Sequence, residues 1–365
     1  MTERHISVEH AVVYREKNHF AAWPANYGLW CWEEEVLVVF ADGRLGDQGK
    51  LHARDMSHNF RPRQARSKDG GRSWTVEEFQ GHVPGGESLS ADEHVERPLR
   101  SGPKLQDTKF GRVNAPIDFL DPECILLAAR TGLGMDARSW FYLSRNRGTR
   151  WEGPFAFIGL DMAGVTTRTD IVPISSRHAL FMVTCAKPDG QEGRTLCVES
   201  LDGGRSFQAK CWLPYDDNSY SIMPSSVRLG GDTVLTVIRR GRGIEKDGWL
   251  ESFKSEDLGK SWRPMGFPVE NTGPGGNPGS LIRLSGGRLA LVYGSRVKPY
   301  GIRIKISSDG GRSWSSEQNV GQTAPLPDLG YPRAVISNDG TLLTVYYTNA
   351  GRERFIEATR IKVTR

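Results

Sequence analysis

Five copies of one short motif constrain the fold of this chain more than any other sequence feature. Each copy reads Ser-x-Asp/Asn-x-Gly-x-x-aromatic, and the copies occupy residues 67–74, 144–151, 200–207, 255–262 and 307–314. This spacing is typical of propeller blades rather than of helical solenoids. Asp and Ser side chains can bond the free backbone N–H groups of a tight turn, and Gly supplies positive φ. We therefore interpret the motif as a structural hairpin turn, with aspartates that are not catalytic.

Strand-like segments surround the motifs in a regular plan. Two or three apolar runs precede each copy and one follows it, and a sixth unit without the motif begins at Tyr331. The apolar segment 6–14 would add the missing strand of that last unit and close the ring. We therefore predict an all-β fold, a six-bladed β-propeller that occupies residues 1–365 as a single domain. The longest interval between motifs predicts an insertion at about 80–111.

Composition limits the partners and the compartment. The chain has 48 Lys and Arg against 43 Asp and Glu, a net charge of +5, without a long basic block. Because this excess is small for 365 residues, we predict no nucleic-acid partner. No apolar run approaches the roughly 20 residues that span a bilayer, so we predict no membrane partner. Five scattered cysteines and a polar N-terminus favour reduced, buried thiols and a cytoplasmic location.

The five motifs resemble the BNR, or Asp-box, repeat of the sialidase (neuraminidase) superfamily, and the resemblance covers nearly the whole chain. It implies that the repeats lie on one face of the propeller. The reacting site would then lie on the opposite face, where the first strand of each blade begins and the second ends. Members usually carry an Arg-Ile-Pro triplet at the entry to the first blade and a Glu at the entry to the fourth. Here residues 22–26 lack that Arg and residues 220–224 lack that Glu.

The resemblance also implies a set of site residues. Sialidases use a Tyr nucleophile, an Asp acid/base and an arginine clamp for the substrate carboxylate. Tyr331 and Asp55 match the first two, and Arg239 and Arg296 match two arginines of the clamp. Further residues at the same predicted rim complete the substrate-binding set, in which arginines favour a carboxylate or sulfate: Trp23, Arg54, Arg168, Asp170 and Arg333.

The segment from His52 to His58 holds the densest group of chemistry-bearing side chains, His-Ala-Arg-Asp-Met-Ser-His. Its His-x-x-Asp-x-x-His spacing suits a metal ion, but no second ligand group accompanies it. Proton transfer is the favoured use, because histidine titrates near neutrality and Asp55 can orient it. We therefore add His52 to the catalytic residues and predict neither a metal nor another cofactor.

These observations predict a sialidase-like exo-glycoside hydrolase that acts on an acidic, carboxylate-bearing sugar, with Tyr331 as the nucleophile and Asp55 as the acid. Two alternatives stay open. A polysaccharide lyase that cleaves next to a uronate would need only His52, a tyrosine such as Tyr331 or Tyr300, and neighbouring cations. A carbohydrate-binding propeller would need no catalyst. The predicted partner is an acidic oligosaccharide or glycoside, and the oligomeric state is left open.

Overall fold

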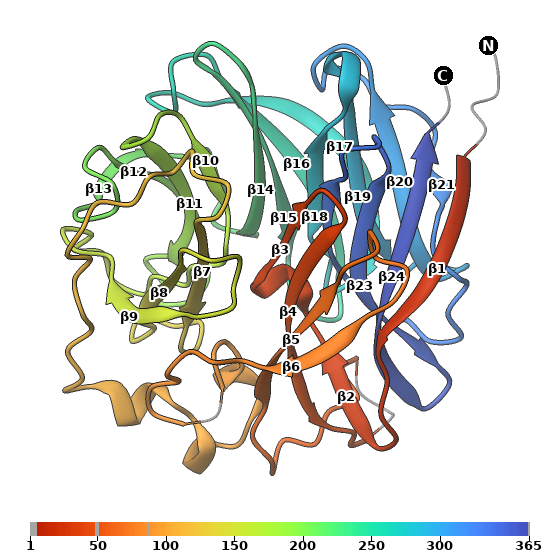
Figure 1. Ribbon diagram of the computed structural model, residues 1–365, viewed down its shortest axis with the longest axis horizontal. Helices are drawn as coiled ribbons and strands as arrows, with labels where there is room; N and C mark the ends of the chain where they lie inside the picture. The colour runs from red at the N-terminus through yellow and green to blue at the C-terminus, as the bar shows by residue number, and fades with distance from the viewer. Residues whose placement is uncertain (1–5, 48–50, 87, 364–365) are drawn as a thin grey trace.

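Strands make up nearly all regular structure in the computed structural model, which describes residues 6–47, 51–86 and 88–363. They form an all-β propeller, in which sheets surround a common axis (Figure 1). Five short 3-10 helices occur in the described residues, and three of them lie in the segment between β6 and β7. The helices are η1 (Pro24–Asn26), η2 (Asp92–His94), η3 (Arg97–Leu99), η4 (Gly102–Leu105) and η5 (Ser285–Gly287).

Four sheets stand as separate antiparallel blades. The first has three strands, β7 (Ile125–Arg130), β8 (Ser139–Ser144) and β9 (Glu152–Ala156). The second has β10 (Ile171–Pro173), β11 (Ala179–Ala186), β12 (Glu192–Ser200) and β13 (Gln208–Trp212). The third has β14 (Tyr220–Gly230), β15 (Thr233–Gly241), β16 (Asp247–Ser255) and β17 (Arg263–Pro274). The fourth has β18 (Gly279–Arg283), β19 (Leu289–Ser295), β20 (Gly301–Ser307) and β21 (Gln318–Asn319).

The remaining strands join the two ends of the chain in one nine-stranded sheet. Its main path runs β22-β23-β24-β2-β4-β5-β6, while β1 pairs with β24 and β3 with β4. The strands are β1 (Ile6–Tyr14), β2 (His19–Ala22), β3 (Gly28–Trp32), β4 (Glu35–Arg44), β5 (Arg61–Ser67), β6 (Thr75–Glu78), β22 (Gly330–Ile336), β23 (Leu342–Ala350) and β24 (Glu353–Val363).

The prediction of six blades is therefore wrong as a count of sheets. Four blades stand alone, and the strands at the N-terminal end of the chain share one sheet with those at the C-terminal end. The short strand β2 makes this connection. It pairs antiparallel with β4 and meets β24 through a single parallel bridge between Phe20 and Arg354. One bridge of this kind is enough to merge the hydrogen-bonded ladders of two units.

Each repeat forms the turn between two neighbouring strands: β5 and β6, β8 and β9, β12 and β13, β16 and β17, or β20 and β21. In the last copy, the Ser307 hydroxyl donates to Asp309 at 2.9 Å and accepts the N–H of Gly311 at 2.9 Å. The Asp309 carboxylate also accepts the N–H of Ser313 at 2.9 Å, and Gly310 and Gly311 have φ of 72° and 86°. The Ser and Asp side chains thus satisfy the free backbone N–H groups of the turn, and the glycines adopt its left-handed backbone conformation.

Side chains also connect neighbouring units at the axis. The Leu281 N–H donates to the Ser225 hydroxyl at 2.9 Å, and the Ala334 N–H donates to the Ser280 hydroxyl at 3.0 Å. Each bond joins the innermost strands of adjacent units, β14 to β18 and β18 to β22. The spacing of the inner strands around the axis therefore depends on these short polar side chains.

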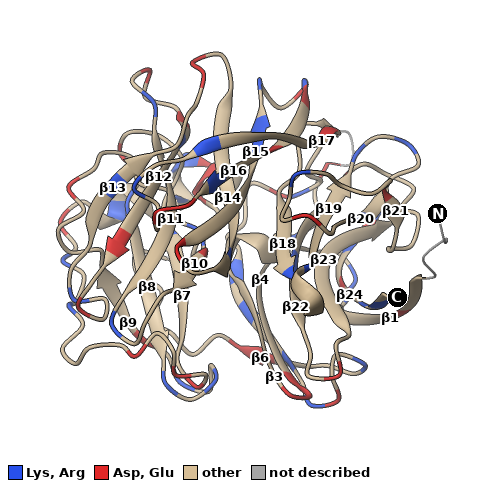
Figure 2. Ribbon diagram, turned by 90° about the horizontal axis from the view of Figure 1, so that it is seen from above, with Lys and Arg blue, Asp and Glu red and all other residues tan. Residues whose placement is uncertain are grey.

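Basic and acidic residues are interspersed over the loops of the propeller in the view of Figure 2. All five cysteines, which lie in described segments, are free thiols, but only Cys185 and Cys197 are buried. The expectation of buried thiols is thus wrong for the other three. Across the described segments, no helix has the length and apolar character required to span a membrane.

Ser307→Ala tests the turn chemistry. The substitution leaves the buried N–H of Gly311 without its acceptor, so we expect the free energy of unfolding to fall by about 1–3 kcal/mol. Urea unfolding measures this loss. Ser316→Ala, at an exposed position two residues beyond the motif, is the matched control and should change stability by less than about 0.5 kcal/mol. Equal effects of the two substitutions would contradict the assigned role of Ser307.

Candidate functional site

A cavity of about 520 Å³ opens at one end of the axis. Its walls include the starts of β12, β14 and β22, the end of β15 and the loops that follow β4, β6, β7 and β17. Its lining combines polar and charged side chains with glycines and apolar side chains. The polar lining residues are His52, Arg54, Glu93, His94, Arg168, Gln191, Glu192, Tyr220, Arg239 and Tyr331.

His52 lies in the loop after β4 and is oriented by a buried carboxylate. Its Nδ1 lies 3.1 Å from Asp328 Oδ1, and the Tyr347 hydroxyl donates to the same oxygen at 2.9 Å. Asp328 also accepts the Arg354 Nε–H at 2.6 Å and the Ala53 N–H at 3.0 Å. Four groups thus hold the carboxylate in one orientation. We assign the Nδ1–H tautomer to His52, because only that nitrogen faces a carboxylate, and Nε2 then carries a free lone pair.

The protonation states of this pair follow from burial and charge. Burial lowers the pKa of His52 to about 4, although the hydrogen bond and charge of Asp328 oppose the shift. For Asp328, burial alone would raise the pKa, but His52 and Arg354 hold it below its ordinary value. At neutral pH the imidazole is therefore neutral and the carboxylate ionised. This is the state in which a histidine accepts a proton.

Tyr331 is the second residue of β22 and has a strained conformation, with φ of 52° immediately before Pro332. The Asn277 side chain holds it there by accepting the Tyr331 N–H at 3.0 Å and donating to Leu329 O at 3.0 Å. Arg239 Nη1 donates to the Tyr331 hydroxyl at 2.8 Å. Burial raises the pKa of this hydroxyl, but the charges of Arg239, Arg296 and Arg168 outweigh it, and the pKa lies below 10. The phenol therefore gives up its proton more readily than an ordinary tyrosine.

The segment after β6 brings two further titratable groups to the cavity. The His94 ring stacks on Trp23 with 4.0 Å between ring centroids, and its buried Nδ1 has no hydrogen-bond partner in the described residues. Glu93 pairs with Arg130, with 2.5 Å between Oε1 and Nη2. Burial alone would raise the pKa of Glu93, but the charge of Arg130 brings it to about 2. Glu93 is therefore an ionised, paired carboxylate.

The cavity arginines differ in how far protein partners occupy them. Arg168 pairs with Glu192 at 2.7 Å and donates to Asn26 at 3.2 Å. Arg54 donates to the carbonyl oxygens of His52 and His94 at 3.1 and 3.3 Å. Arg239 bonds Tyr331 and the Gly275 carbonyl oxygen. Because Arg54 and Arg239 have no carboxylate partner among the described residues, they are the cations available to a bound anion.

The structure brings together five of the predicted site residues in this cavity: His52, Arg54, Arg168, Arg239 and Tyr331.

The other five predicted site residues do not line this cavity. Asp55 bonds Ser57 and His58 on the solvent side of its loop, so it does not reach the cavity as the predicted acid. Trp23 is fully buried beneath His94 and offers no face to a sugar. Arg296 donates to four backbone carbonyl oxygens. It therefore holds the loops next to Tyr331 and does not act as a clamp for a substrate carboxylate. Asp170 and Arg333 line a different cavity.

Sequence reasoning missed three important groups. Asp328 precedes β22 in a segment without periodicity, and nothing in the sequence connects it to His52, which lies 276 residues away. Glu93 and His94 belong to the insertion predicted at about 80–111, in which we predicted no site residue. The acidic-His cluster at 92–94 is the one signal that pointed to them.

No family model matches the sequence, and no curated protein matches it. Solved structures do. A protein of unknown function from Dyadobacter fermentans has a TM-score of 0.72 at 20% identity, covering 98% of this chain and 99% of that chain. The NanB sialidase from Streptococcus pneumoniae has a TM-score of 0.60 at 12% identity, and the match covers 96% of this chain and 70% of that chain. Trypanosoma rangeli sialidase in complex with 2,3-difluorosialic acid has a TM-score of 0.62 at 11% identity, and the match covers 97% of this chain and 58% of that chain. The chain therefore has a sialidase-like propeller fold.

The buried histidine predicts a specific loss of stability in acid. Because the pKa of His52 is about 4 in the folded protein and 6.5 ordinarily, the unfolded chain takes up a proton first as the pH falls. The contribution of the neutral His52 to the free energy of unfolding is therefore fully present above pH 6.5. It declines as the pH falls toward 4, with a slope that approaches about 1.4 kcal/mol per pH unit.

Urea unfolding of the wild type and of His52→Gln across this window isolates the effect. The variant lacks the titrating group, so the stability difference between the two proteins should shrink steadily as the pH falls. A difference that stays constant would show that His52 has an ordinary pKa.

Proposed function

We propose that the protein cleaves the glycosidic bond next to a uronate by β-elimination, with His52 as the base and Tyr331 as the acid. One observation carries this proposal. Among the described residues of the cavity, both carboxylates are engaged in ion pairs, Glu93 with Arg130 and Glu192 with Arg168. A glycosidase of the ordinary kind needs a protonated carboxylic acid, whereas elimination needs a base, a weak acid and cations.

The reaction uses the groups in the following way. His52 Nε2 takes the proton from the carbon next to the uronate carboxylate. The electron pair of that C–H bond forms a double bond to the neighbouring carbon, whose bond to the glycosidic oxygen breaks. The leaving oxygen takes the proton of the Tyr331 hydroxyl. Proton exchange with solvent then restores both residues.

Cations lower the barrier of the first step. Removal of the proton puts negative charge on the carboxylate, and a positive group fixed beside that carboxylate stabilises the charge as it develops. Arg54 and Arg239 are suited to this role, since neither has a carboxylate partner in the described segments. Arg239 also bonds the Tyr331 hydroxyl at 2.8 Å, which couples the carboxylate site to the acid.

Hydrolysis by a Tyr331 nucleophile is the second candidate, and the fold favours it. One similar structure is a covalent intermediate of Trypanosoma rangeli sialidase with 2,3-difluorosialic acid. The lowered pKa of Tyr331 suits a nucleophile as well as an acid. This route lacks an evident proton donor for the leaving group, because Asp55 faces solvent. BNR-type repeats and an acidic sugar are common to both candidates.

An assay with uronate-containing oligosaccharides and with sialosides separates the candidates. We expect an ultraviolet-absorbing unsaturated product from the uronates, because elimination creates a double bond conjugated with the carboxylate. His52→Gln and Tyr331→Phe should each lower kcat by about 100-fold or more, the usual contribution of a general acid or base. Asp55→Asn should retain activity.

Other results would overturn elimination. Reducing sugar without the unsaturated product, lost in Tyr331→Phe, would establish hydrolysis. Loss of activity in Asp55→Asn would restore Asp55 as the acid. Glycan binding without turnover would make the propeller a binding module.

A further inference from the structure

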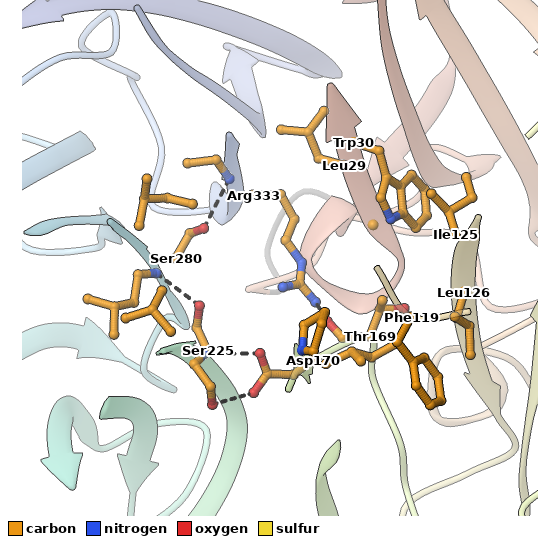
Figure 3. A pocket seen from close by; sticks show the side chains of 18 of the residues that line it. Leu29, Trp30, Phe119, Ile125, Leu126, Thr169, Asp170, Ser225, Ser280 and Arg333 are labelled. Atoms are coloured by element: carbon orange, nitrogen blue, oxygen red, sulfur yellow. Dashed lines mark hydrogen bonds between the residues drawn. The ribbon is translucent and has the colours of Figure 1, made fainter. Parts of the chain in front are cut away.

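A second cavity, of about 330 Å³, lies at the other end of the inner strands (Figure 3). All six innermost strands reach it: β3, β7, β10, β14, β18 and β22. On β14, Tyr220 and Ile222 line the first cavity and residues 225–227 line the second. Between the two lies only a narrow space of about 10 Å³. It is enclosed by Ala25, Arg168, Met223, Pro224, Pro278, Gly279, Pro332 and Arg333.

Arg333 places a positive charge in the second cavity. Its Nη2 donates to the carbonyl oxygens of Ala25 and Thr169, which fixes the guanidinium. Its buried Nε has no hydrogen-bond partner in the described residues. A buried donor without a partner costs free energy unless a ligand or water satisfies it. The guanidinium is therefore held in place with donor capacity left over.

Asp170 places a negative charge in the same cavity. Its two oxygens accept the N–H and the hydroxyl of Ser226, at 3.0 and 2.7 Å. A carboxylate has about four acceptor positions, so two remain. Burial raises the pKa of Asp170 to about 6, although Ser226 and Arg333 oppose the shift. Within the described chain, Asp170 and Arg333 form no ion pair with each other.

Hydroxyl groups extend the polar side of the cavity. Three of them accept a backbone N–H and donate to no other group within the described segments, so each keeps a proton for a ligand. The pairs are Thr169 with Ala128 at 3.0 Å, Ser225 with Leu281 at 2.9 Å, and Ser280 with Ala334 at 3.0 Å.

The opposite wall is apolar. Figure 3 shows Trp30, Ile125, Leu126 and Phe119 across the cavity from the serines. Aromatic and branched side chains at this position remove water from an apolar group that lies against them. One wall therefore favours charges and the other favours hydrocarbon.

We propose that this second cavity binds a small zwitterion, an α-amino acid with an apolar or aromatic side chain. Arg333 and the hydroxyls hold its carboxylate, Asp170 holds its ammonium group, and Trp30 and Leu126 contact its side chain. A ligand with a single charge would leave either Asp170 or Arg333 buried and unpaired, which is unfavourable. The cavity volume lies at the lower end of the range for small-molecule sites, which suits a ligand of this size.

Titration calorimetry on the full chain tests the proposal with three matched ligands: phenylalanine, the analogue without its amino group, and the analogue without its carboxylate. We expect phenylalanine to bind at least about tenfold more tightly than either analogue, because each analogue leaves one buried charge unpaired. Asp170→Asn, which keeps an oxygen for Ser226, should weaken phenylalanine and leave the deaminated analogue unaffected.

The location is tested separately. Arg333→Met should weaken phenylalanine and the deaminated analogue alike. Tyr331→Phe, in the first cavity, should leave phenylalanine binding unchanged. The proposal is wrong if phenylalanine and leucine do not bind to the wild type, if the three matched ligands bind equally, or if Tyr331→Phe abolishes binding. None of these results depends on whether the first cavity is an enzyme site.

Discussion

Hydrogen bonds from short side chains between neighbouring innermost strands determine the geometry on which both cavities depend. The bonds of Ser225 to Leu281 and of Ser280 to Ala334 join three successive sheets at the axis. The bond of Asn277 to Tyr331 does the same at the mouth of the first cavity. These side chains are buried, so loss of one partner would leave a polar group without water. The ring therefore holds the walls of both cavities at a defined spacing.

Charge pairing decides which residues of the first cavity remain available for chemistry. Arginines are numerous there, but Arg130 and Arg168 are neutralised by Glu93 and Glu192. Arg296 is saturated by carbonyl oxygens that support the neighbouring loops. What remains is the neutral His52, the stacked His94, a tyrosine with a lowered pKa and two cations. This inventory is the physical reason to favour proton transfer over acid-assisted hydrolysis.

The sequence was informative where the fold repeats itself. The spacing of the motifs was sufficient to predict an all-β propeller, and the turn chemistry at Ser307 and Asp309 follows from residue types alone. The count of separate sheets was not predictable, because a single parallel bridge between Phe20 and Arg354 has no sequence signature.

The site was predictable only where it follows the repeat. Arg239 and Tyr331 occupy strand ends that the repeat locates. Asp55 illustrates the opposite case. Its closeness to His52 in the sequence suggested that it orients the imidazole, but in the structure Asp328 bonds His52. Loop residues that meet across the ring carry no periodicity, and the insertion that delivers His94 lies outside the blade pattern.

Backbone strain at the axis connects the fold to the chemistry. Trp23, Met223 and Tyr331 each have φ between 52° and 61°, and each precedes a proline. Such conformations are costly for residues other than glycine and persist only where the surroundings impose them. At Tyr331 the surroundings are the Asn277 side chain and the Arg239 guanidinium, which hold the backbone and the hydroxyl respectively. Contacts from the loop before β18 and from β15 therefore fix Tyr331 on β22, so the position of the phenol depends on several sheets and not on one loop.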